Sequence, residues 1–233
     1  MFFDPLYLVV IGIGMGLSLY ASSITKGRFK KYSQYTTASR LTGARVAQSI
    51  LHDNNINDVS IEKIGGELSD HYDPRTKTLR LSSSVHDSNS MAAFGVAAHE
   101  AGHAIQHAKS YAMLSFRSAW VPVTNISSRL SMIVIMLAFF LGGTQSVMGG
   151  SLAFLGVLMF GCTTLFTLIT LPVEFDASKR ALACLQQGRY VNDKELDGAR
   201  KVLNAAAMTY VAAFITSVLT LLYYAYILFG RRN

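Results

Sequence analysis

Four long apolar runs constrain the fold of this chain more than any other feature. They cover residues 5–22, 130–148, 152–173 and 208–229, and a helix needs about 20 apolar residues to cross the hydrocarbon core of a bilayer. The second run is the weakest, because Gly142–Gln145 interrupts it. The chain is 51% hydrophobic and only 15% charged, whereas soluble domains carry about 25% charged residues. The sequence therefore predicts a mainly α-helical integral membrane protein with about four transmembrane helices.

The basic residues predict how these helices are oriented. Most of the 21 Lys and Arg lie in two polar regions, residues 23–120 and 174–207. Because cytoplasmic loops of membrane proteins carry an excess of Lys and Arg, we expect both regions to face the cytoplasm and both termini to face outward. Arg231 and Arg232 are exceptions to this rule, because they follow the last apolar run on the side that is expected to face outward. We expect one integral domain, residues 1–233, that crosses the cell membrane several times, with the bacterial plasma membrane as the expected location.

The polar regions predict a small α+β portion. Residues 37–52 have the apolar spacing of an amphipathic helix, and residues 59–64 alternate like a strand. Residues 67–81 indicate two short strands around an Asp73-Pro74 turn. A short β-hairpin therefore leads into the next helix, an arrangement that is typical of zincin-like folds. The second polar region, residues 174–207, is expected to be a helical insert.

The helix after this hairpin carries the motif His99-Glu100-Ala101-Gly102-His103. Residues i and i+4 lie on one face of a helix, so both imidazoles can reach a single metal ion. Zn²⁺ lowers the pKa of a bound water, and a glutamate between the histidines can take its proton and pass it to a leaving amine. This H-E-x-x-H pattern is typical of zinc metalloproteases. The surrounding residues are small or apolar, so burial of three ionisable groups there would be costly without a metal or polar partners.

A catalytic zinc site usually has a third protein ligand. The metzincin pattern would place a histidine at position 109, which is Lys109, so that pattern is excluded. His107 lies on the same side of the helix, but three ligands on consecutive turns of one straight helix are geometrically awkward. Glu174 is the favoured ligand, because it is the first charge after the third apolar run and two membrane crossings return it to the side of His103. Asp176 is the alternative ligand. We expect it more to orient a ligand histidine than to bind the metal.

These residues resemble a known family. The H-E-x-x-H motif, the later Glu174-x-Asp176-Ala177 segment, the Asp70–Pro74 stretch and the four-span layout look like the bacterial YugP-type neutral zinc metallopeptidases, which are membrane gluzincins. The resemblance covers nearly the whole chain. HtpX and the prenyl-protein proteases are more distantly similar, and their Glu-x-x-Ala-Asp motif follows a span. Ser178 stands where that motif has its aspartate, and Asp176 is the candidate to replace it. The resemblance implies a metal-dependent endopeptidase and identifies no substrate.

The sequence thus predicts a membrane-embedded zinc endopeptidase in which His99, His103 and Glu174 bind Zn²⁺ and Glu100 is the general base toward the metal-activated water. Gluzincins generally add a hydrogen-bond donor to the oxyanion. The candidates for this donor are His71, Tyr72, His107 and Arg180.

The expected partners are the lipid bilayer and protein or peptide substrates, including membrane proteins, because Glu174 follows a span directly. Nucleic acid is not an expected partner, because the basic residues flank apolar runs and form no patterned groove. A metal transporter is disfavoured, since the four runs contain no His, Asp or Glu. The alternative is a non-catalytic, membrane-anchored metal-binding or scaffolding protein, which would not require Glu100. The sequence does not fix the oligomeric state.

Overall fold

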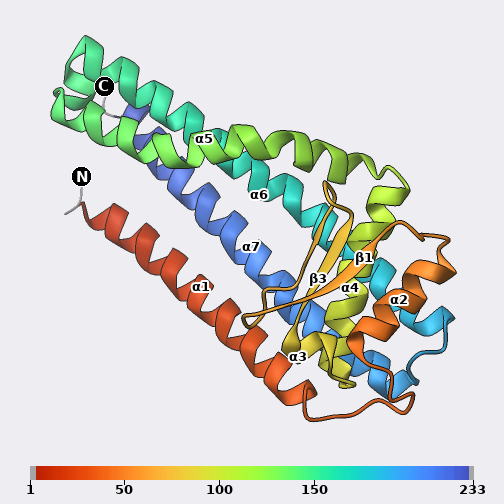
Figure 1. The fold of residues 1–233 in the computed structure, drawn as a ribbon. Helices are drawn as coiled ribbons and strands as arrows, with labels where there is room; N and C mark the ends of the chain where they lie inside the picture. The colour runs from red at the N-terminus through yellow and green to blue at the C-terminus, as the bar shows by residue number, and fades with distance from the viewer. Residues whose placement is uncertain (1–3, 231–233) are drawn as a thin grey trace. The chain divides into compact units, whose positions relative to one another are not determined.

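The computed structural model describes residues 4–230, so Arg231 and Arg232 lie outside the described residues. In chain order the elements are α1 (Pro5–Tyr32), α2 (Gly43–Asp53), β1 (Ser60–Ile64), β2 (His71–Asp73), β3 (Thr78–Ser82), α3 (Ser83–His86), α4 (Met91–Ala108), α5 (Ala112–Phe140), the 3₁₀ helix η1 (Gly143–Gln145), α6 (Val147–Gln187) and α7 (Asp193–Gly230) (Figure 1). The predicted fold class, mainly α-helical with a small sheet, is confirmed.

Four of these helices, α1, α5, α6 and α7, are long and apolar enough to cross a membrane. The second differs from the expected span of residues 130–148. Helix α5 begins far upstream, at Ala112, and ends at Phe140. It ends there because Gly142 and Gly143 have φ angles of +91° and +58°, a left-handed conformation that terminates helices and favours glycine. Residues 141–146 therefore form the turn between α5 and α6.

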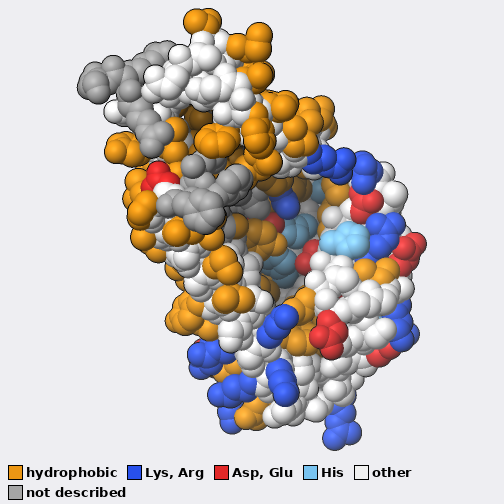
Figure 2. Space-filling model, turned by 90° about the vertical axis from the view of Figure 1, so that its left-hand side faces the viewer, with side chains coloured by type: hydrophobic (Ala, Val, Ile, Leu, Met, Phe, Trp, Pro, Cys, Tyr) orange, Lys and Arg blue, Asp and Glu red, His pale blue; other side chains and the backbone are white. Residues whose placement is uncertain are grey.

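The chain divides into two compact units. The first comprises residues 1–20, 116–171 and 210–233, and we call it the membrane unit. The second comprises residues 21–115 and 172–209, and we call it the polar unit. On the face drawn in Figure 2, apolar side chains gather over the membrane unit, whereas Lys, Arg, Asp and Glu gather over the polar unit. This division does not test the expected single integral domain, which stays a prediction.

The membrane unit has its own apolar core. Tyr7 and Val10 of α1 pack with Ile135 of α5 and with Tyr223 and Tyr224 of α7. Among the side chains that the structure describes, most other large apolar ones of this unit are exposed, as expected for helices whose outer surface contacts lipid.

The polar unit contains a three-stranded sheet with the order β1-β3-β2. Strand β3 lies in the centre, parallel to β1 and antiparallel to β2. The predicted hairpin around Asp73-Pro74 is therefore confirmed. The helix expected over residues 37–52 begins only at Gly43, because Arg40 has a φ of +54° and the Thr42 hydroxyl caps the helix by accepting the N–H of Arg45 at 3.3 Å.

Helix α4 lies at the centre of the polar unit. Its N-terminus is capped by Ser90, whose hydroxyl accepts the N–H of Ala93 at 3.2 Å. The helix contacts α2, α3, β2 and β3, and its residues are buried on almost every face. Eight of its 14 buried residues are alanine or glycine, and these small side chains let neighbouring elements approach its backbone closely. The central helix is thus packed against neighbouring elements on several sides.

The second polar region supplies two further helical segments to this unit, the end of α6 and the start of α7. Helix α6 ends at Gln187, just before Gly188, and α7 begins at Asp193. Asn192 and Glu195 form a reciprocal cap: the Asn192 side chain accepts the N–H of Glu195 at 3.0 Å, and the Glu195 carboxylate accepts the N–H of Asn192 at 2.9 Å. The helical insert expected here is present.

Candidate metal site

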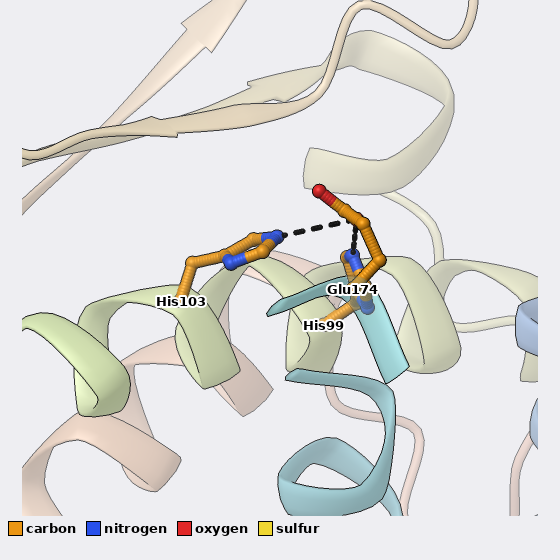
Figure 3. A group of neighbouring side chains, drawn as sticks. All are labelled: His99, His103 and Glu174. Carbon is orange, nitrogen blue, oxygen red and sulfur yellow. Dashed lines mark hydrogen bonds and ion pairs between the residues drawn. The ribbon is translucent and has the colours of Figure 1, made fainter. Parts of the chain in front are cut away.

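The two histidines of the H-E-x-x-H motif lie in the middle of α4 and point to the same side. Their ring centroids are 4.8 Å apart, as the i, i+4 spacing requires. Figure 3 shows both rings directed toward Glu174, which approaches from α6. The structure therefore brings together the three residues that the sequence predicted as metal ligands.

One carboxylate oxygen of Glu174 lies close to both rings. Its Oε2 is 3.2 Å from His99 Nε2 and 3.6 Å from His103 Nε2 (Figure 3). The three candidate ligand atoms all lie within 4.8 Å of one another. Bonds of about 2.0–2.2 Å to a tetrahedral zinc ion place its ligand atoms about 3.3–3.6 Å apart. Two imidazoles and one carboxylate are also a donor set of catalytic zinc sites, so these residues fit zinc.

The electrostatics of the cluster favour a cation. Glu174 is only 2% exposed and His103 9% exposed. Burial lowers the pKa of His103, but the neighbouring carboxylates of Glu174 and Glu100 outweigh it and raise that pKa above its usual value. The two carboxylates thus favour positive charge at this position. A metal ion bound there would require its ligand histidines to be neutral.

Glu100 lies beside this cluster. Its side chain is buried, with 8% exposed, and its charge is among the causes of the raised pKa of His103. The charge of this carboxylate therefore acts on the ring of a candidate ligand.

Gly102, the second variable residue of the motif, permits α6 to pass close to α4. A Cβ atom at this position would lie 2.6 Å from the backbone oxygen of Ala177. Backbone atoms cannot rotate away, so any larger residue would force the helices apart. Because Ala177 lies one turn after Glu174, this close approach determines how far the carboxylate reaches over α4.

The outward nitrogens of both histidines are hydrogen-bonded as well. His99 Nδ1 lies 3.1 Å from the hydroxyl of Ser178, and His103 Nδ1 lies 3.0 Å from the amide oxygen of Gln106. Ser178 therefore contacts a candidate ligand even though it replaces the expected aspartate. Gln106 was not among the residues predicted from the sequence. The signal that could have found it is a polar side chain three positions after His103, in a helix that is otherwise small or apolar apart from its histidines and Glu100.

Asp176 does not contact either histidine directly. Its Oδ2 accepts from the side chain of Gln106 at 2.8 Å and from Nε of Arg180 at 2.5 Å. The expected contact of Asp176 with a ligand histidine is thus replaced by an indirect one, in which the longer Gln106 side chain spans the gap to His103.

Two of the four oxyanion candidates come together. Tyr72 of β2 and His107 of α4 share a hydrogen bond of 2.8 Å between the tyrosine hydroxyl and Nδ1. Burial, together with the charges of Asp58 and Asp73, raises the pKa of Tyr72 to about 12. The phenol therefore keeps its proton at neutral pH and remains a hydrogen-bond donor.

The other two candidates are engaged elsewhere. His71 is exposed, and its Nδ1 contacts the backbone oxygen of Ser69 at 2.8 Å. Arg180 pairs with Asp176, and its guanidinium lies 5.6 Å from the ring centre of Tyr111. Neither is brought to the Tyr72–His107 pair by these contacts.

Similarity to known proteins extends over nearly the whole chain. Residues 7–229 match the family described as "Putative neutral zinc metallopeptidase". This chain belongs to that family. It is also 40% identical over 230 residues to "Putative membrane protease YugP" of Bacillus subtilis (strain 168), an alignment that covers 98% of this chain and 99% of that protein. No solved structure matches the chain. The resemblance inferred from the motifs is confirmed, and zinc is the metal of this peptidase family.

Proposed function

We propose that this protein is a membrane-bound zinc endopeptidase in which His99, His103 and Glu174 bind the metal and Glu100 is the general base. The observation that carries the proposal is the convergence of two imidazole nitrogens and a carboxylate oxygen within 4.8 Å, beside a buried glutamate. Membership of a zinc metallopeptidase family supports peptidase activity in general. The assignment of roles to individual residues rests on the geometry.

The metal and the residues around the site have separate roles in the proposed peptide hydrolysis. Zinc, when bound, supplies a Lewis acid that polarises the scissile carbonyl and lowers the pKa of water. Glu100 accepts the proton of the attacking water and then donates it to the leaving amine nitrogen. Tyr72 donates its one hydroxyl hydrogen to the developing oxyanion, while Nδ1–H of His107 donates to the tyrosine oxygen and holds it in place.

We also propose that the site faces the cytoplasm and acts on protein or peptide substrates that include juxtamembrane segments of membrane proteins. The excess of Lys and Arg in residues 23–120 and 174–207 supports this orientation. Glu174 follows the third apolar run without an intervening polar linker. The carboxylate that we assign as a ligand is therefore tied closely along the chain to a membrane-crossing helix.

The Glu100→Gln variant tests the catalytic assignment. Glutamine preserves the shape of the side chain but cannot accept a proton, so cleavage of an unfolded protein should fall by about 10³-fold or more, within the range of general acid–base catalysis. The zinc content of the purified, detergent-solubilised protein should not change. Glu67→Gln, which alters an exposed glutamate of the same unit, is the matched control and should cleave normally.

Three outcomes separate the possibilities. Cleavage by Glu100→Gln at the wild-type rate would refute Glu100 as the base. Full zinc content in His103→Ala would refute the metal site. A zinc-loaded wild type that cleaves none of a broad set of unfolded and membrane substrates would instead favour the metal-binding or scaffolding alternative.

A further inference from the structure

One buried polar side chain beside the candidate metal site has no role in the reaction proposed above. Gln106 lies on α4, three residues after His103, and is fully buried. A buried amide destabilises a protein unless its polar atoms are hydrogen-bonded. Both polar atoms of this amide have partners, and all of these partners lie around the candidate metal site.

The contacts of the Gln106 amide allow only one orientation. Its Nε2 lies 2.9 Å from the backbone oxygen of Val173 and 2.8 Å from Oδ2 of Asp176. A backbone carbonyl can only accept a hydrogen bond, so the NH₂ group of the amide must face Val173. Both hydrogens of this group are used by the two oxygens. The amide oxygen is therefore directed at His103.

This orientation fixes the tautomer of His103. The amide oxygen lies 3.0 Å from Nδ1 of His103, and since that oxygen only accepts, Nδ1 must carry a hydrogen. In the neutral ring the lone pair then belongs to Nε2, the atom that lies 3.6 Å from Glu174 Oε2. His99 is held differently, because the Ser178 hydroxyl at its Nδ1 can donate or accept. Of the two histidines, His103 is the one whose tautomer its surroundings impose.

The same amide also joins the two helices that supply the candidate ligands. Val173 directly precedes Glu174, so the bond from Gln106 to the Val173 carbonyl ties α4 to the turn of α6 that carries the carboxylate. The bond to Asp176 holds the other end of this turn. Gln106 thus contacts the ring of His103, and its other two hydrogen bonds go to residues just before and just after Glu174 in the sequence.

We propose that Gln106 is a positioning residue: it fixes the tautomer and ring orientation of His103 and locks that ring to the α6 turn that carries Glu174. Partners of ligand histidines typically change metal affinity about 10–100-fold when they are removed. This inference rests on the proposed metal site, and the experiments below separate the failure of one from the failure of the other.

Zinc affinity is the first measurement. In the Gln106→Leu variant the side-chain volume is similar but all three hydrogen bonds are lost, so zinc should bind about 10–100-fold more weakly in competition with a chelating indicator. Gln48→Leu makes the same substitution at an exposed position of α2 and should bind zinc like the wild type. Wild-type affinity in Gln106→Leu would overturn the inference.

A spectroscopic signature distinguishes positioning from a general structural role. Histidines labelled with ¹⁵N report the tautomer of each ring by NMR, and the His103 signal is the one that is absent from His103→Ala. In the zinc-loaded wild type, Nδ1 of His103 should carry a hydrogen that exchanges slowly with solvent. At saturating zinc, Gln106→Leu should lose this protection while the other histidine signals stay in place. Unchanged protection would overturn the inference.

A rescue experiment covers the case in which Gln106→Leu fails to fold. Gln106→Glu keeps an acceptor for His103 but cannot donate, and it places a second carboxylate against Asp176. Adding Asp176→Asn restores a donor between the two side chains. The double variant should bind zinc about tenfold more tightly than Gln106→Glu alone, with Asp176→Asn alone as the reference. An absence of recovery would overturn the inference.

The parent proposal is tested in the same series. If His103→Ala binds zinc as tightly as the wild type, the metal site itself is wrong and the role of Gln106 falls with it. If His103→Ala loses zinc while every Gln106 variant binds it normally, the proposed function stands and only the positioning role is refuted.

Discussion

The phenol of Tyr72, which we propose as the oxyanion donor, comes from a short edge strand, whereas the candidate ligands lie on helices. Strand β2 has only three residues, and its central side chain reaches His107 on α4. His107 follows His103 by four residues, so it lies one turn further along the same face of the helix. The raised pKa of Tyr72, about 12, keeps the hydroxyl protonated. A neutral donor of this kind stabilises an oxyanion without adding a charge to the free site.

The Tyr72→Phe variant removes this donor and little else. We expect kcat for a peptide substrate to fall about 100-fold, in the range found when one oxyanion donor is deleted, while KM and zinc content stay close to wild type. Tyr190→Phe is the matched control, because its hydroxyl also forms a hydrogen bond, to Asp53 on the surface. Steady-state kinetics of both variants decide the point, and an unchanged kcat in Tyr72→Phe would exclude its role.

At the scale of elements, the contact between α4 and α6 determines whether the three candidate ligands meet. Neither helix carries the whole set: α4 provides two histidines, and the turn of α6 around Ala177 provides the carboxylate. At Gly102 the backbone of α4 lies against the backbone of α6 at Ala177. The distance between the two helices there depends on the absence of a side chain at Gly102. By contrast, a Cβ at Gly95 would meet Ala199 at an ordinary distance of 3.4 Å.

Adding one methyl group to each glycine should therefore have opposite effects. Gly102→Ala should push α6 away from α4, weaken zinc binding at least about tenfold and destabilise the fold by about 1–3 kcal/mol, as overpacking does. Gly95→Ala should leave zinc affinity unchanged and stabilise the helix by up to about 1 kcal/mol. Chelator competition and thermal unfolding of both variants provide the measurements. Equal zinc affinity in the two variants would show that this helix contact does not set the site.

At the scale of the whole molecule, the distribution of charge along the chain predicts the side of the membrane on which the chemistry occurs. The polar unit contains the candidate metal site and most of the Lys and Arg residues. The turn between α5 and α6, by contrast, has no charged residue. A cytoplasmic polar unit and an external α5–α6 turn satisfy the positive-inside rule together.

Cysteine labelling in intact cells tests this topology. In a background with Cys162 and Cys184 replaced by serine, the Gln145→Cys variant should react with a membrane-impermeant maleimide added from outside. The Asn57→Cys variant should react only after the membrane is permeabilised. Both positions are exposed in the structure, so a difference in labelling would report the side of the membrane. The reverse pattern would place the polar unit, and the proposed site within it, outside the cell.

Features that depend on neighbours along the chain could be predicted from the sequence. The apolar runs gave four membrane-capable helices by length and composition alone, the i, i+4 spacing placed His99 and His103 on one face, and Asp73-Pro74 marked the hairpin. Each is a local property of the backbone, which sequence patterns report directly. The end of the second span was misjudged, because the expected run was extended across Gly142–Gln145 to residue 148. Gly142 and Gly143 have positive φ angles, and the helix ends at Phe140.

Glu174 could be predicted from the sequence because chain topology limits which residues can return to the same side of a membrane. The residues that orient the candidate ligands could not be predicted in this way. Gln106 contacts Val173, and Ser178 contacts His99, across 67 and 79 positions of sequence. Tyr72 and His107 come from different elements. Such pairings depend on the exact packing of α4 against α6 and β2, and no periodicity or composition encodes that packing. The sequence by itself determined which groups could bind a metal; only the tertiary structure decided which side chains orient them.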